Sequence, residues 1–486
     1  MNLAAIIEPH PDDAVALVDE SGSTTYGALR DKVGRLRGGL VGLGLVPGDR
    51  VGLICGNNAG FVVAYLATVG AGLVAVPLNP LSPGRELQRE LAAVGARGVI
   101  VGPAGQPSFS GIDAAEVPSL EHRMMVEDLP AGEPVPIVDR DAADLAVLIF
   151  TSGTAGSPKA AMLTHGNLLS NLEQMQAHPA RTQDPSDVTF GVLPLFHIFG
   201  LNVVLGLSLF AGARVVLIER FDPSAAIEAI RHNGVTIVPG APAMWTAWAT
   251  LPEATHDAFA SVRLAASGAA KLALEVAEQC ERRFGVAITE GYGLTEASPV
   301  VTTASGIVTK PGSIGVPLPG VRLRLVDSEG DDVLVGDAGE LWVQGPNVFS
   351  GYWNDAEATA RALTPDGWLR TGDIAVVDDD GALYLVDRAK DLIIVSGFNV
   401  YPAEVEDVIC EHPAVEACAV VGDVDPHSGE CVHAFVVLVP GQSIEEGDLI
   451  AFCADRLARY KCPDKVTFVD ELPTGVGGKI LRRALR

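Results

Sequence analysis

Short apolar runs alternate with longer helical patterns along the first two thirds of the chain. The run VGLIC at 51–55 precedes NAGFVVAYLATVGAG, and the run RVVLI at 214–218 precedes DPSAAIEAIRHNG. The run AVLIF at 146–150 leads in the same way into a glycine-rich stretch. Short β-branched runs bounded by turn residues are typical of strands, and the longer stretches fit helices. The pattern therefore predicts an α/β fold in which helices cover largely parallel sheets.

The pattern changes after about residue 310, where the apolar runs become short and turns become frequent. The segments GELWVQG and GALYLVD predict antiparallel hairpins. From Asp391 onward, strand and helix patterns alternate in an α+β arrangement of ordinary domain size. We therefore expect a large N-terminal domain at 1–388 with a β-rich subdomain at about 310–388, a boundary at 389–390, and a small C-terminal domain at 391–486.

Composition narrows the class of protein. A chain of 486 residues, 48% of them hydrophobic, exceeds what one hydrophobic core accommodates. The formal net charge of -27 argues against nucleic acid as a partner, because phosphate backbones are bound by clustered Lys and Arg. The 7 cysteines form no CxxC pair, which favours reduced thiols in the cytoplasm over a disulfide framework or a zinc site. The start MNLAAIIEPHPDD lacks a basic region, so no signal peptide is expected.

One stretch, 188–213, contains no charged residue and is long enough to cross a bilayer. Pro194, His197, Asn202 and Ser208 interrupt it. The stretch divides into a strand-like half and a helix-like half, and we interpret it as part of a buried α/β core rather than a transmembrane segment.

The most informative motif is TSGTAGSPKAAMLTH at 151–165, directly after an apolar strand pattern. Its glycines allow backbone N–H groups to close around phosphate oxygens, its hydroxyls add donors, and Lys159 adds positive charge. It is not a Walker A loop, because Pro158 precedes the lysine and Ala160 follows it. The motif predicts a phosphate-binding loop, and an ordinary polar turn after a strand is the alternative.

A second motif, ITEGYGLTEASP at 288–299, also follows a strand pattern. Tyr292 offers a flat face to a purine, Thr295 a hydroxyl to a phosphate, and Glu296 a hard oxygen ligand to magnesium. The alternative is a βα turn in which Thr295 caps the following helix.

Three more segments complete a set of five: RTGD at 370–373, DRAKDLIIVSGFNVYPAEVE at 387–406, and GVGGKILRR at 475–483. In order and spacing the five resemble the signature motifs of the adenylate-forming superfamily. This superfamily contains acyl- and aryl-CoA synthetases, beetle luciferases and the adenylation domains of peptide synthetases. The resemblance covers essentially the whole chain, and it implies an enzyme that uses ATP and Mg²⁺ to activate a carboxylic acid as its acyl-AMP.

The resemblance implies a role for each matching residue. The implied catalytic residues are Lys479, Glu296 and Thr295, and the implied metal ligands are Glu296 and Thr154. The implied phosphate-binding residues are Thr151, Ser152, Gly153, Thr154, Ala155, Gly156 and Lys159. The implied adenine- and ribose-binding residues are Ser267, Gly268, Ala269, Gly291, Tyr292, Gly293, Asp373 and Arg388.

The same resemblance implies a moving C-terminal domain. Lys479 would bridge the substrate carboxylate and the α-phosphate, where a fixed cation stabilises the charge that builds up in the transition state. Lys390 takes the hinge position, about which the small domain rotates after adenylation. The rotation would withdraw Lys479 and present the turn Ser396, Gly397 and Phe398 for the step with coenzyme A.

The acyl pocket follows from segments that resemble its walls. They supply His197, Phe199, Met244 and Gly291, and they are apolar or small apart from the histidine. His197 could gate the tunnel, and a satisfied core histidine is the alternative. The wall favours an apolar acid.

These observations predict an ATP- and Mg²⁺-dependent acid:CoA ligase that acts on a fatty or otherwise hydrophobic acid. Two related alternatives are an aryl-CoA ligase and a ligase that passes the acyl group to a carrier protein. An alternative of another class is a non-catalytic nucleotide-binding protein on the same scaffold. The presence of Lys159, Glu296, Asp373, Arg388 and Lys479 argues against that last alternative.

Overall fold

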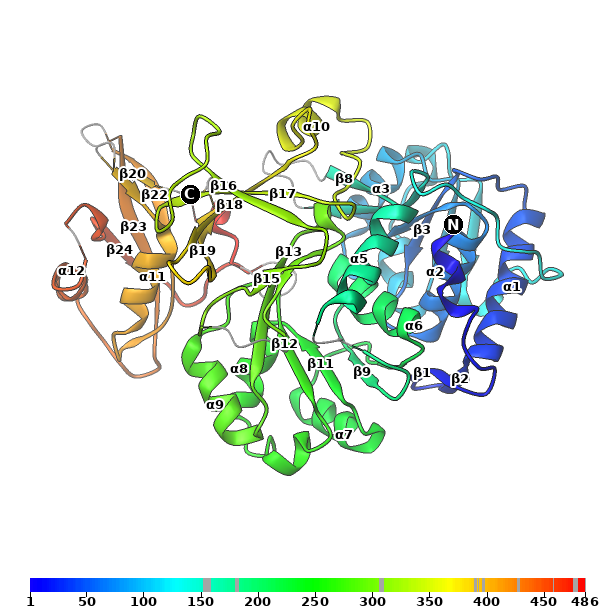
Figure 1. Ribbon diagram of the computed structural model, residues 1–486, viewed down its shortest axis with the longest axis horizontal. Helices are drawn as coiled ribbons and strands as arrows, with labels where there is room; N and C mark the ends of the chain where they lie inside the picture. Colours follow the sequence, from blue (N-terminus) through cyan, green and yellow to red (C-terminus); the bar gives the residue numbers. More distant parts are fainter. Residues whose placement is uncertain are drawn as a thin grey trace. The chain divides into compact units, whose positions relative to one another are not determined.

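The computed structural model of the chain (Figure 1) describes residues 1–151, 159–179, 183–305, 310–388, 391, 393–395, 398–425, 429–457, 459–474 and 480–485. The chain divides into two compact units. The first unit contains residues 1–322 and 343–369, and the second contains residues 323–342 and 370–486. Residues 370–388 therefore group with the residues that follow them. The hinge expected at 389–390 lies outside the described residues, and the expected boundary stays a prediction.

A nine-stranded sheet runs through the first unit in the order β15-β14-β13-β12-β11-β9-β10-β1-β2. Its strands are β1 (Val15–Asp19), β2 (Gly22–Thr25), β9 (Val188–Gly191), β10 (Arg214–Leu217), β11 (Ile237–Gly240), β12 (Leu264–Ser267), β13 (Ile288–Gly293), β14 (Val300–Thr303) and β15 (Val316–Pro317). The strands from β1 through β10, β9, β11 and β12 to β13 pair in parallel, while β2, β14 and β15 add antiparallel edges. The predicted parallel α/β sheet is confirmed.

A six-stranded sheet, also in the first unit, has the order β6-β5-β3-β4-β7-β8. Its strands are β3 (Arg50–Ile54), β4 (Val74–Pro77), β5 (Gly98–Val101), β6 (His122–Met125), β7 (Leu145–Thr151) and β8 (Lys159–Thr164). All neighbours are parallel except β7 and β8, which form an antiparallel pair. The glycine-rich motif therefore begins and ends on two strands of one hairpin, and the sequence analysis predicted only the first of these strands.

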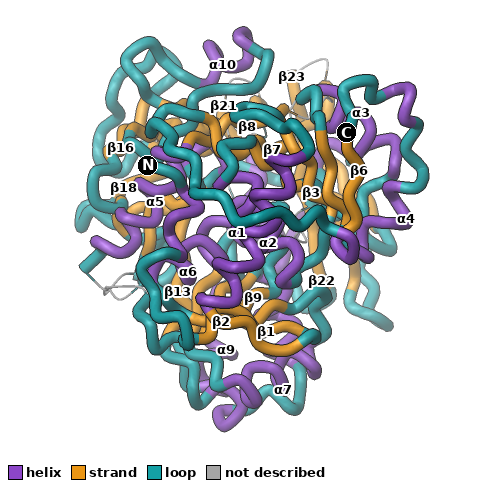
Figure 2. Tube along the Cα trace, turned by 90° about the vertical axis from the view of Figure 1, so that its right-hand side faces the viewer, coloured by secondary structure: helices purple, strands orange, loops and turns teal. Residues whose placement is uncertain are grey.

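Helices cover these sheets, and several begin at capping residues that the sequence provides. They are α1 (Tyr26–Gly42), α2 (Ala59–Gly70), α3 (Gly84–Ala93), α4 (Gln106–Phe109), α5 (His165–Ala177), α6 (Leu207–Ala211), α7 (Pro223–Asn233), α8 (Pro242–Thr250), α9 (Leu274–Phe284) and α10 (Ala356–Ala362). Thr164 and Asn167 form a reciprocal capping box at the start of α5. The helices α1 and α2 lie side by side (Figure 2), and α8 packs against α9 (Figure 1).

The uncharged stretch at 188–213 belongs to the buried core of the first unit, as the sequence pattern indicated. It forms β9, a π-helix at Phe199–Gly206 and the short helix α6, and most of its side chains are buried. Across the described ranges, no helix is both long and apolar enough to cross a membrane. The π-helix is unusual, and such segments occur frequently at functional sites.

The second unit contains most of a four-stranded sheet in the order β16-β17-β18-β19 and a second sheet in the order β21-β20-β23-β22, with β24 beside β23. The elements are β16 (Arg322–Val326), β17 (Ala338–Gln344), β18 (Leu369–Val377), β19 (Leu383–Arg388), β20 (Ile393–Val395), β21 (Phe398–Val400), α11 (Pro402–Cys410), β22 (Val415–Asp425), β23 (Gly429–Leu438), α12 (Glu446–Ala454) and β24 (Lys465–Phe468). The helices α11 and α12 bury Val405, Ile409 and Leu449 against the second sheet. The predicted smaller α+β domain is confirmed as a class of fold.

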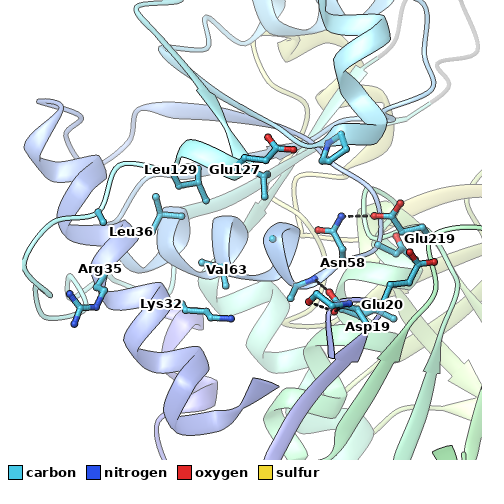
Figure 3. A pocket seen from close by; sticks show the side chains of 18 of the residues that line it. Asp19, Glu20, Lys32, Arg35, Leu36, Asn58, Val63, Glu127, Leu129 and Glu219 are labelled. Carbon is cyan, nitrogen blue, oxygen red and sulfur yellow. Dashed lines mark hydrogen bonds between the residues drawn. The ribbon is translucent and has the colours of Figure 1, made fainter. Parts of the chain in front are cut away.

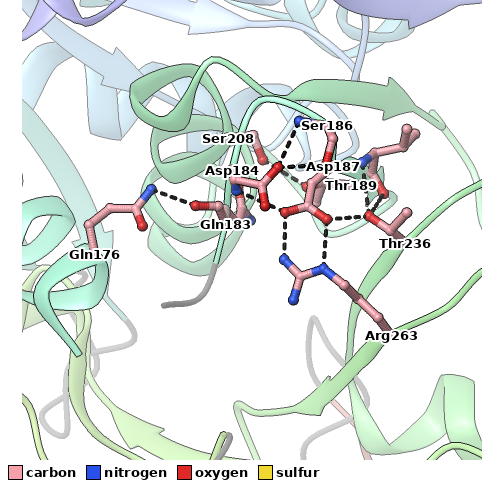
Figure 4. Close-up of polar contacts among 10 residues, drawn as sticks. Gln176, Gln183, Asp184, Ser186, Asp187, Thr189, Ser208, Thr236 and Arg263 are labelled. Atoms are coloured by element: carbon pink, nitrogen blue, oxygen red, sulfur yellow. Dashed lines mark hydrogen bonds and ion pairs between the residues drawn. The ribbon is translucent and has the colours of Figure 1, made fainter. Parts of the chain in front are cut away.

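An ion pair with a buried carboxylate links the amino-terminal ends of three neighbouring strands in the nine-stranded sheet (Figure 4). Asp187 is 2% exposed and directly precedes β9. It accepts hydrogen bonds from Arg263 Nε at 2.8 Å and from Thr236 Oγ1 at 2.7 Å. Burial by itself would raise the pKa of Asp187, but the hydrogen bonds from Arg263 and Thr236 hold that pKa below its usual value. The carboxylate is therefore ionised in the folded protein.

We expect Arg263→Ala to lower the free energy of unfolding by about 2 kcal/mol, below the usual loss for a fully buried pair because Arg263 is 43% exposed. Because folding depresses the pKa of Asp187, its contribution is present above the unfolded pKa of about 3.9 and disappears as pH falls through the folded value. Urea unfolding at pH 7 and at low pH measures both effects. Arg231→Ala, which removes the exposed pair with Glu228, is the control and should change little. Equal destabilisation by the two variants would contradict the role of Asp187.

Candidate active site

The ends of the predicted phosphate loop are held together by a hairpin. Thr151 ends β7, Lys159 begins β8, and the two residues are partners in the antiparallel register. The Thr151 hydroxyl donates to the carbonyl oxygen of Lys159 at 3.4 Å. The predicted loop residues Ser152, Gly153, Thr154, Ala155 and Gly156 lie outside the described residues. The structure therefore pairs the two residues that flank this loop, Thr151 and Lys159, in one hairpin.

A tyrosine that the sequence motifs did not include joins the first motif to the second. The Tyr352 ring lies under Lys159, whose Nζ is 5.2 Å from the ring centroid. The Tyr352 hydroxyl donates to Glu296 Oε1 at 2.7 Å. The segment around Tyr352 runs beside β8, where Trp353 N–H donates to the carbonyl oxygen of Ala160 at 2.8 Å. The structure therefore brings the predicted phosphate cation to the ring face, and the predicted metal ligand to the hydroxyl, of one tyrosine.

The electrostatics of this contact fix the direction of its hydrogen bond. Burial raises the pKa of Tyr352 well above its usual range, and the adjacent Glu296 carboxylate raises it further. The phenol therefore keeps its proton and donates it to Glu296 Oε1. The Glu296 carbonyl oxygen also accepts from Phe349 N–H at 2.8 Å, so the same segment holds both the main chain and the side chain of the glutamate.

The predicted adenine-binding segments meet at the carboxyl ends of parallel strands. Gly240 pairs with Ser267 across β11 and β12, and Ser267 pairs with Glu290 across β12 and β13. Ser267 is 2% exposed, and its Oγ finds no hydrogen-bond partner in the described part of the chain. Ala269 has a φ of 72°, a conformation that a residue with a side chain rarely adopts. An unpaired buried hydroxyl and local strain at this edge are both typical of a ligand site.

Two of the predicted acyl-pocket residues lie against these strand ends. A Cβ on Gly268 would come within 2.9 Å of Phe199 Cε1, so the Phe199 ring packs against the predicted adenine-binding segment. A Cβ on Gly240 would lie 3.5 Å from Met244 Cε and 2.9 Å from Trp245 Nε1. Glycine is therefore required at both strand ends because large side chains fill the adjacent space.

A third predicted pocket residue, Gly291, has a different constraint. A Cβ there would lie 2.9 Å from the carbonyl oxygen of Thr302 on the neighbouring strand β14. Glycine at 291 therefore permits the pairing of β13 with β14, and Tyr292 beside it is 7% exposed.

His197 lies two residues before Phe199, just ahead of the π-helix. Its side chain reaches solvent, yet desolvation by the surrounding protein lowers the pKa of the imidazole. Phe199 N–H donates to His197 Nδ1 at 3.3 Å, so this nitrogen acts as an acceptor. The ring is therefore neutral at pH 7, and its N–H proton is on Nε2.

In the second unit, the predicted ribose residues are register partners. Asp373 on β18 pairs with Arg388 on β19, and Asp373 is 7% exposed. Gly372 has a φ of 70°, and its N–H donates to Glu340 Oε1 at 3.0 Å. Phe398 begins β21. Lys390, Ser396, Gly397 and Lys479 lie outside the described residues, so their predicted roles are not tested.

A cavity of about 570 Å³ opens elsewhere in the first unit, beside α1 and α2 (Figure 3). None of the predicted site residues is among the described residues that line it. Its acidic groups serve the start of α2: Asp19 Oδ2 accepts from Ala59 N–H at 2.8 Å, and Asn58 Nδ2 donates to Glu219. These carboxylates therefore stabilise a helix terminus and a loop.

The described parts of the chain contain no group of three or more His, Cys, Asp and Glu side chains that could hold a metal ion. Tyr352 holds Oε1 of Glu296 by a hydrogen bond. A carboxylate near the predicted phosphate loop suits Mg²⁺, which commonly keeps several waters and binds through one or two carboxylates and substrate phosphates. Unpaired polar groups at the ends of parallel strands and a carboxylate near a glycine-rich motif are typical of nucleotide-dependent enzymes.

Known proteins identify its family. Residues 3–353 match the AMP-binding enzyme family, and residues 404–479 match the AMP-binding enzyme C-terminal domain. A feruloyl-CoA synthase from Amycolatopsis sp is 39% identical over 487 residues, which cover 99% of this chain and 96% of that protein. A long-chain-fatty-acid–CoA ligase from Bacillus subtilis is 35% identical, with 91% of this chain and 86% of the relative covered.

The solved structures agree with the sequence relatives. The crystal structure of ATP-bound MatB from Rhodopseudomonas palustris superposes with a TM-score of 0.93 at 34% identity, covering 100% of this chain and 98% of that one. The chain therefore belongs to the AMP-binding enzyme family, within the adenylate-forming superfamily that includes the AMP-forming acyl-CoA synthetases. The resemblance of the five motifs is thereby confirmed at the level of the family.

Proposed function

We propose that this protein is an ATP- and Mg²⁺-dependent carboxylic acid:CoA ligase that forms an acyl-AMP and then an acyl-CoA. The observation that carries the proposal is the contact chain from Lys159 through the Tyr352 ring to Glu296. This chain of contacts links Lys159 to the candidate magnesium ligand, and all three of its residues lie in the described part of the structure. The CoA ligases and synthases among the relatives support the same reaction class.

Magnesium fits the donors at this point of the chain. Glu296 is a hard oxygen donor, and Tyr352 orients its carboxylate by a hydrogen bond to Oε1. Glu296, with Thr154 of the loop, would hold the ion against the ATP phosphates. When bound, Mg²⁺ would neutralise charge on the phosphates and so favour departure of pyrophosphate.

In the first half-reaction, a carboxylate oxygen of the acid attacks the α-phosphorus of ATP, and the bond to pyrophosphate breaks. Lys159 balances charge on the departing phosphates, and we assign Lys479 to the substrate carboxylate and the α-phosphate. Ser267 supplies a buried hydroxyl toward the nucleotide, and Asp373 accepts hydrogen bonds from the ribose hydroxyls. Preorganised charge of this kind stabilises the transition state because it needs no reorientation during the reaction.

In the second half-reaction, the thiol sulfur of coenzyme A attacks the acyl carbonyl and AMP leaves. We assign the hinge to Lys390 and the thiol-side turn to Ser396, Gly397 and Phe398. Rotation about the hinge lets one pocket serve both half-reactions, since Lys479 withdraws before the thiol enters. We also propose that the protein acts in the cytoplasm, which the free state of all its cysteine thiols supports.

The acid itself is proposed to be hydrophobic, and two classes compete. The residues Phe199, Met244 and Trp245 beside the strand ends favour an apolar acyl group. A fatty acid agrees with the Bacillus subtilis relative, and an aromatic acid agrees with the Amycolatopsis relative, which is similar over 99% of this chain. Burial of one methylene group of the acid contributes only about 0.8 kcal/mol to binding. The apolar character of the wall therefore does not select a chain length, which depends on the depth of the pocket.

A panel of fatty and aromatic acids tests the proposal. We expect at least one acid to support ATP–pyrophosphate exchange without coenzyme A, and AMP formation that depends on coenzyme A. Parallel reactions with holo-carrier protein in place of free coenzyme A separate a CoA ligase from a carrier-loading ligase. Tight ATP binding without exchange for any acid would instead favour a non-catalytic nucleotide-binding protein.

A further inference from the structure

Two cysteines of the second unit lie in direct contact. Cys410 ends the helix α11 and Cys418 lies on the strand β22, against which that helix packs. Their sulfur atoms are 3.4 Å apart, although both are free thiols. Cys410 is exposed, whereas Cys418 is 5% exposed. The pair thus consists of an accessible thiol backed by a buried one.

The surroundings make the two thiols chemically different. The hydrogen bond from Cys418 lowers the pKa of Cys410, even though burial and the nearby Glu406 and Asp407 oppose this. The same pairing raises the pKa of Cys418, together with its burial. The Cys418 sulfur also lies 3.4 Å from the carbonyl oxygen of Glu406, an alternative acceptor for its single S–H, and this contact holds the sulfur against the last turns of the helix. Cys410 is therefore the thiol that more readily becomes a thiolate, which is the nucleophilic form.

Two cysteines of the first unit contrast with this pair. Cys55 and Cys280 are buried and donate to the carbonyl oxygens of Ile100 and Trp245, each at 3.6 Å. Burial raises the pKa of Cys55 to about 12 and that of Cys280 to about 11. These thiols are protected both by position and by protonation.

We propose that Cys410 and Cys418 form an oxidation site that closes to a disulfide when the protein meets a peroxide. A disulfide needs sulfur atoms about 2.05 Å apart, so the pair needs an approach of little more than about 1 Å. Cytoplasmic disulfides are rare and usually transient or redox-sensing, which is the class this pair would join. The site is separate from the proposed acid:CoA ligation and does not depend on it.

The chemistry balances with hydrogen peroxide as the oxidant. The Cys410 thiolate attacks one peroxide oxygen, the O–O bond breaks, and hydroxide leaves while Cys410 becomes a sulfenic acid. The Cys418 sulfur then attacks the Cys410 sulfur, the S–O bond breaks, and the hydroxyl group leaves with the Cys418 proton as water. Two thiols lose two electrons in total, and one peroxide gains them.

The disulfide would join the end of α11 to β22 across a short loop. The helix α11 begins at Pro402, directly after the strand β21 that carries Phe398 of the proposed thiol-side turn. Oxidation would therefore fix the carboxyl end of α11 to β22, while the amino end of α11 follows the proposed thiol-side turn. A thiol reductant reverses the bond, since exchange with a thiolate opens a disulfide.

Peptide mapping of the intact protein tests the site. The native protein is treated with about equimolar hydrogen peroxide, remaining thiols are alkylated under denaturing conditions, and the chain is cleaved after glutamate. Glu411 and Glu416 lie between the two cysteines, so the fragments DVICE and ACAVVGDVDPHSGE separate unless a disulfide joins them. We expect this linked pair, lighter by two hydrogen atoms than the separate fragments, and its loss on addition of dithiothreitol.

Single variants assign the order of the steps. Cys418→Ser should stop at a sulfenic acid on Cys410 that dimedone traps, and Cys410→Ser should give neither product. Cys431→Ser, which changes a buried thiol on the adjacent strand β23, is the control and should keep the wild-type yield of linked fragments. Wild-type protein whose Cys410 and Cys418 both remain alkylatable, or whose disulfides join other cysteines, would overturn the proposal. So would direct conversion of Cys410 to a sulfinic acid in the presence of Cys418.

Discussion

Replacing Lys479 with Ala should lower ATP–pyrophosphate exchange by about 10²–10³-fold, the cost of removing one preorganised donor from a developing charge, or about 3–4 kcal/mol. The same variant should make thioester from supplied acyl-AMP and coenzyme A at nearly the wild-type rate. The difference arises because the first half-reaction builds charge at phosphorus, whereas the second expels AMP from an acyl carbonyl. Measuring both half-reactions on the same preparation checks the prediction.

The control for Lys479 is another lysine of the second unit. Lys465 lies on β24 and pairs with Asp423 at 3.3 Å on an exposed surface. Lys465→Ala removes one positive charge from a chain that already carries a net charge of -27, but it should leave both half-reactions unchanged. Equal loss of the two half-reactions in Lys479→Ala would contradict the domain rotation and would indicate a structural role for the lysine.

The sheets of this fold could be predicted from the sequence because the chain repeats one local pattern many times. Runs such as RVVL at β10 and LAVLIFT at β7 are apolar, β-branched and bounded by turn residues, and each forms a buried strand. The hairpin partner β8 was not predicted. Its sequence KAAMLT is short and alanine-rich, so it carries little strand preference, and its state depends on pairing with β7 and on the adjacent segment that contains Tyr352.

The candidate site was predictable only where chemistry and local sequence coincide. Thr151, Lys159 and Glu296 belong to short polar motifs, whereas Tyr352 lies in the segment FSGYW, where nothing indicates phosphate chemistry. Tyr352 reaches Glu296 across 56 positions of sequence, a contact that only the tertiary fold creates. The strain at Ala269 and the unpaired Ser267 hydroxyl also could not be predicted from the sequence. Backbone conformation and hydrogen bonding at strand ends depend on the neighbouring strands.

Glu296→Gln should lower kcat/KM for acyl-AMP formation by about 10²-fold and raise the Mg²⁺ concentration needed for half-maximal activity. Glutamine keeps an oxygen that can accept from the Tyr352 hydroxyl, so the fold should be retained, but it removes the negative charge that attracts the ion. Magnesium titrations of pyrophosphate exchange measure the effect. Normal activity and normal magnesium dependence in this variant would exclude Glu296 as the metal ligand.

Tyr352→Phe distinguishes the contribution of the Tyr352 hydroxyl from that of its ring. Phenylalanine keeps the aromatic face under Lys159 but cannot donate to Glu296, so the carboxylate loses the contact that orients it. Removing a partner that orients a metal ligand typically weakens metal binding by about 10–100-fold, so we expect a milder magnesium defect than in Glu296→Gln. In the double variant the two defects should not add, because the hydroxyl acts through the carboxylate. Tyr384→Phe, which removes a hydroxyl contact with Asp378 at 3.4 Å in the second unit, should leave the magnesium titration unchanged.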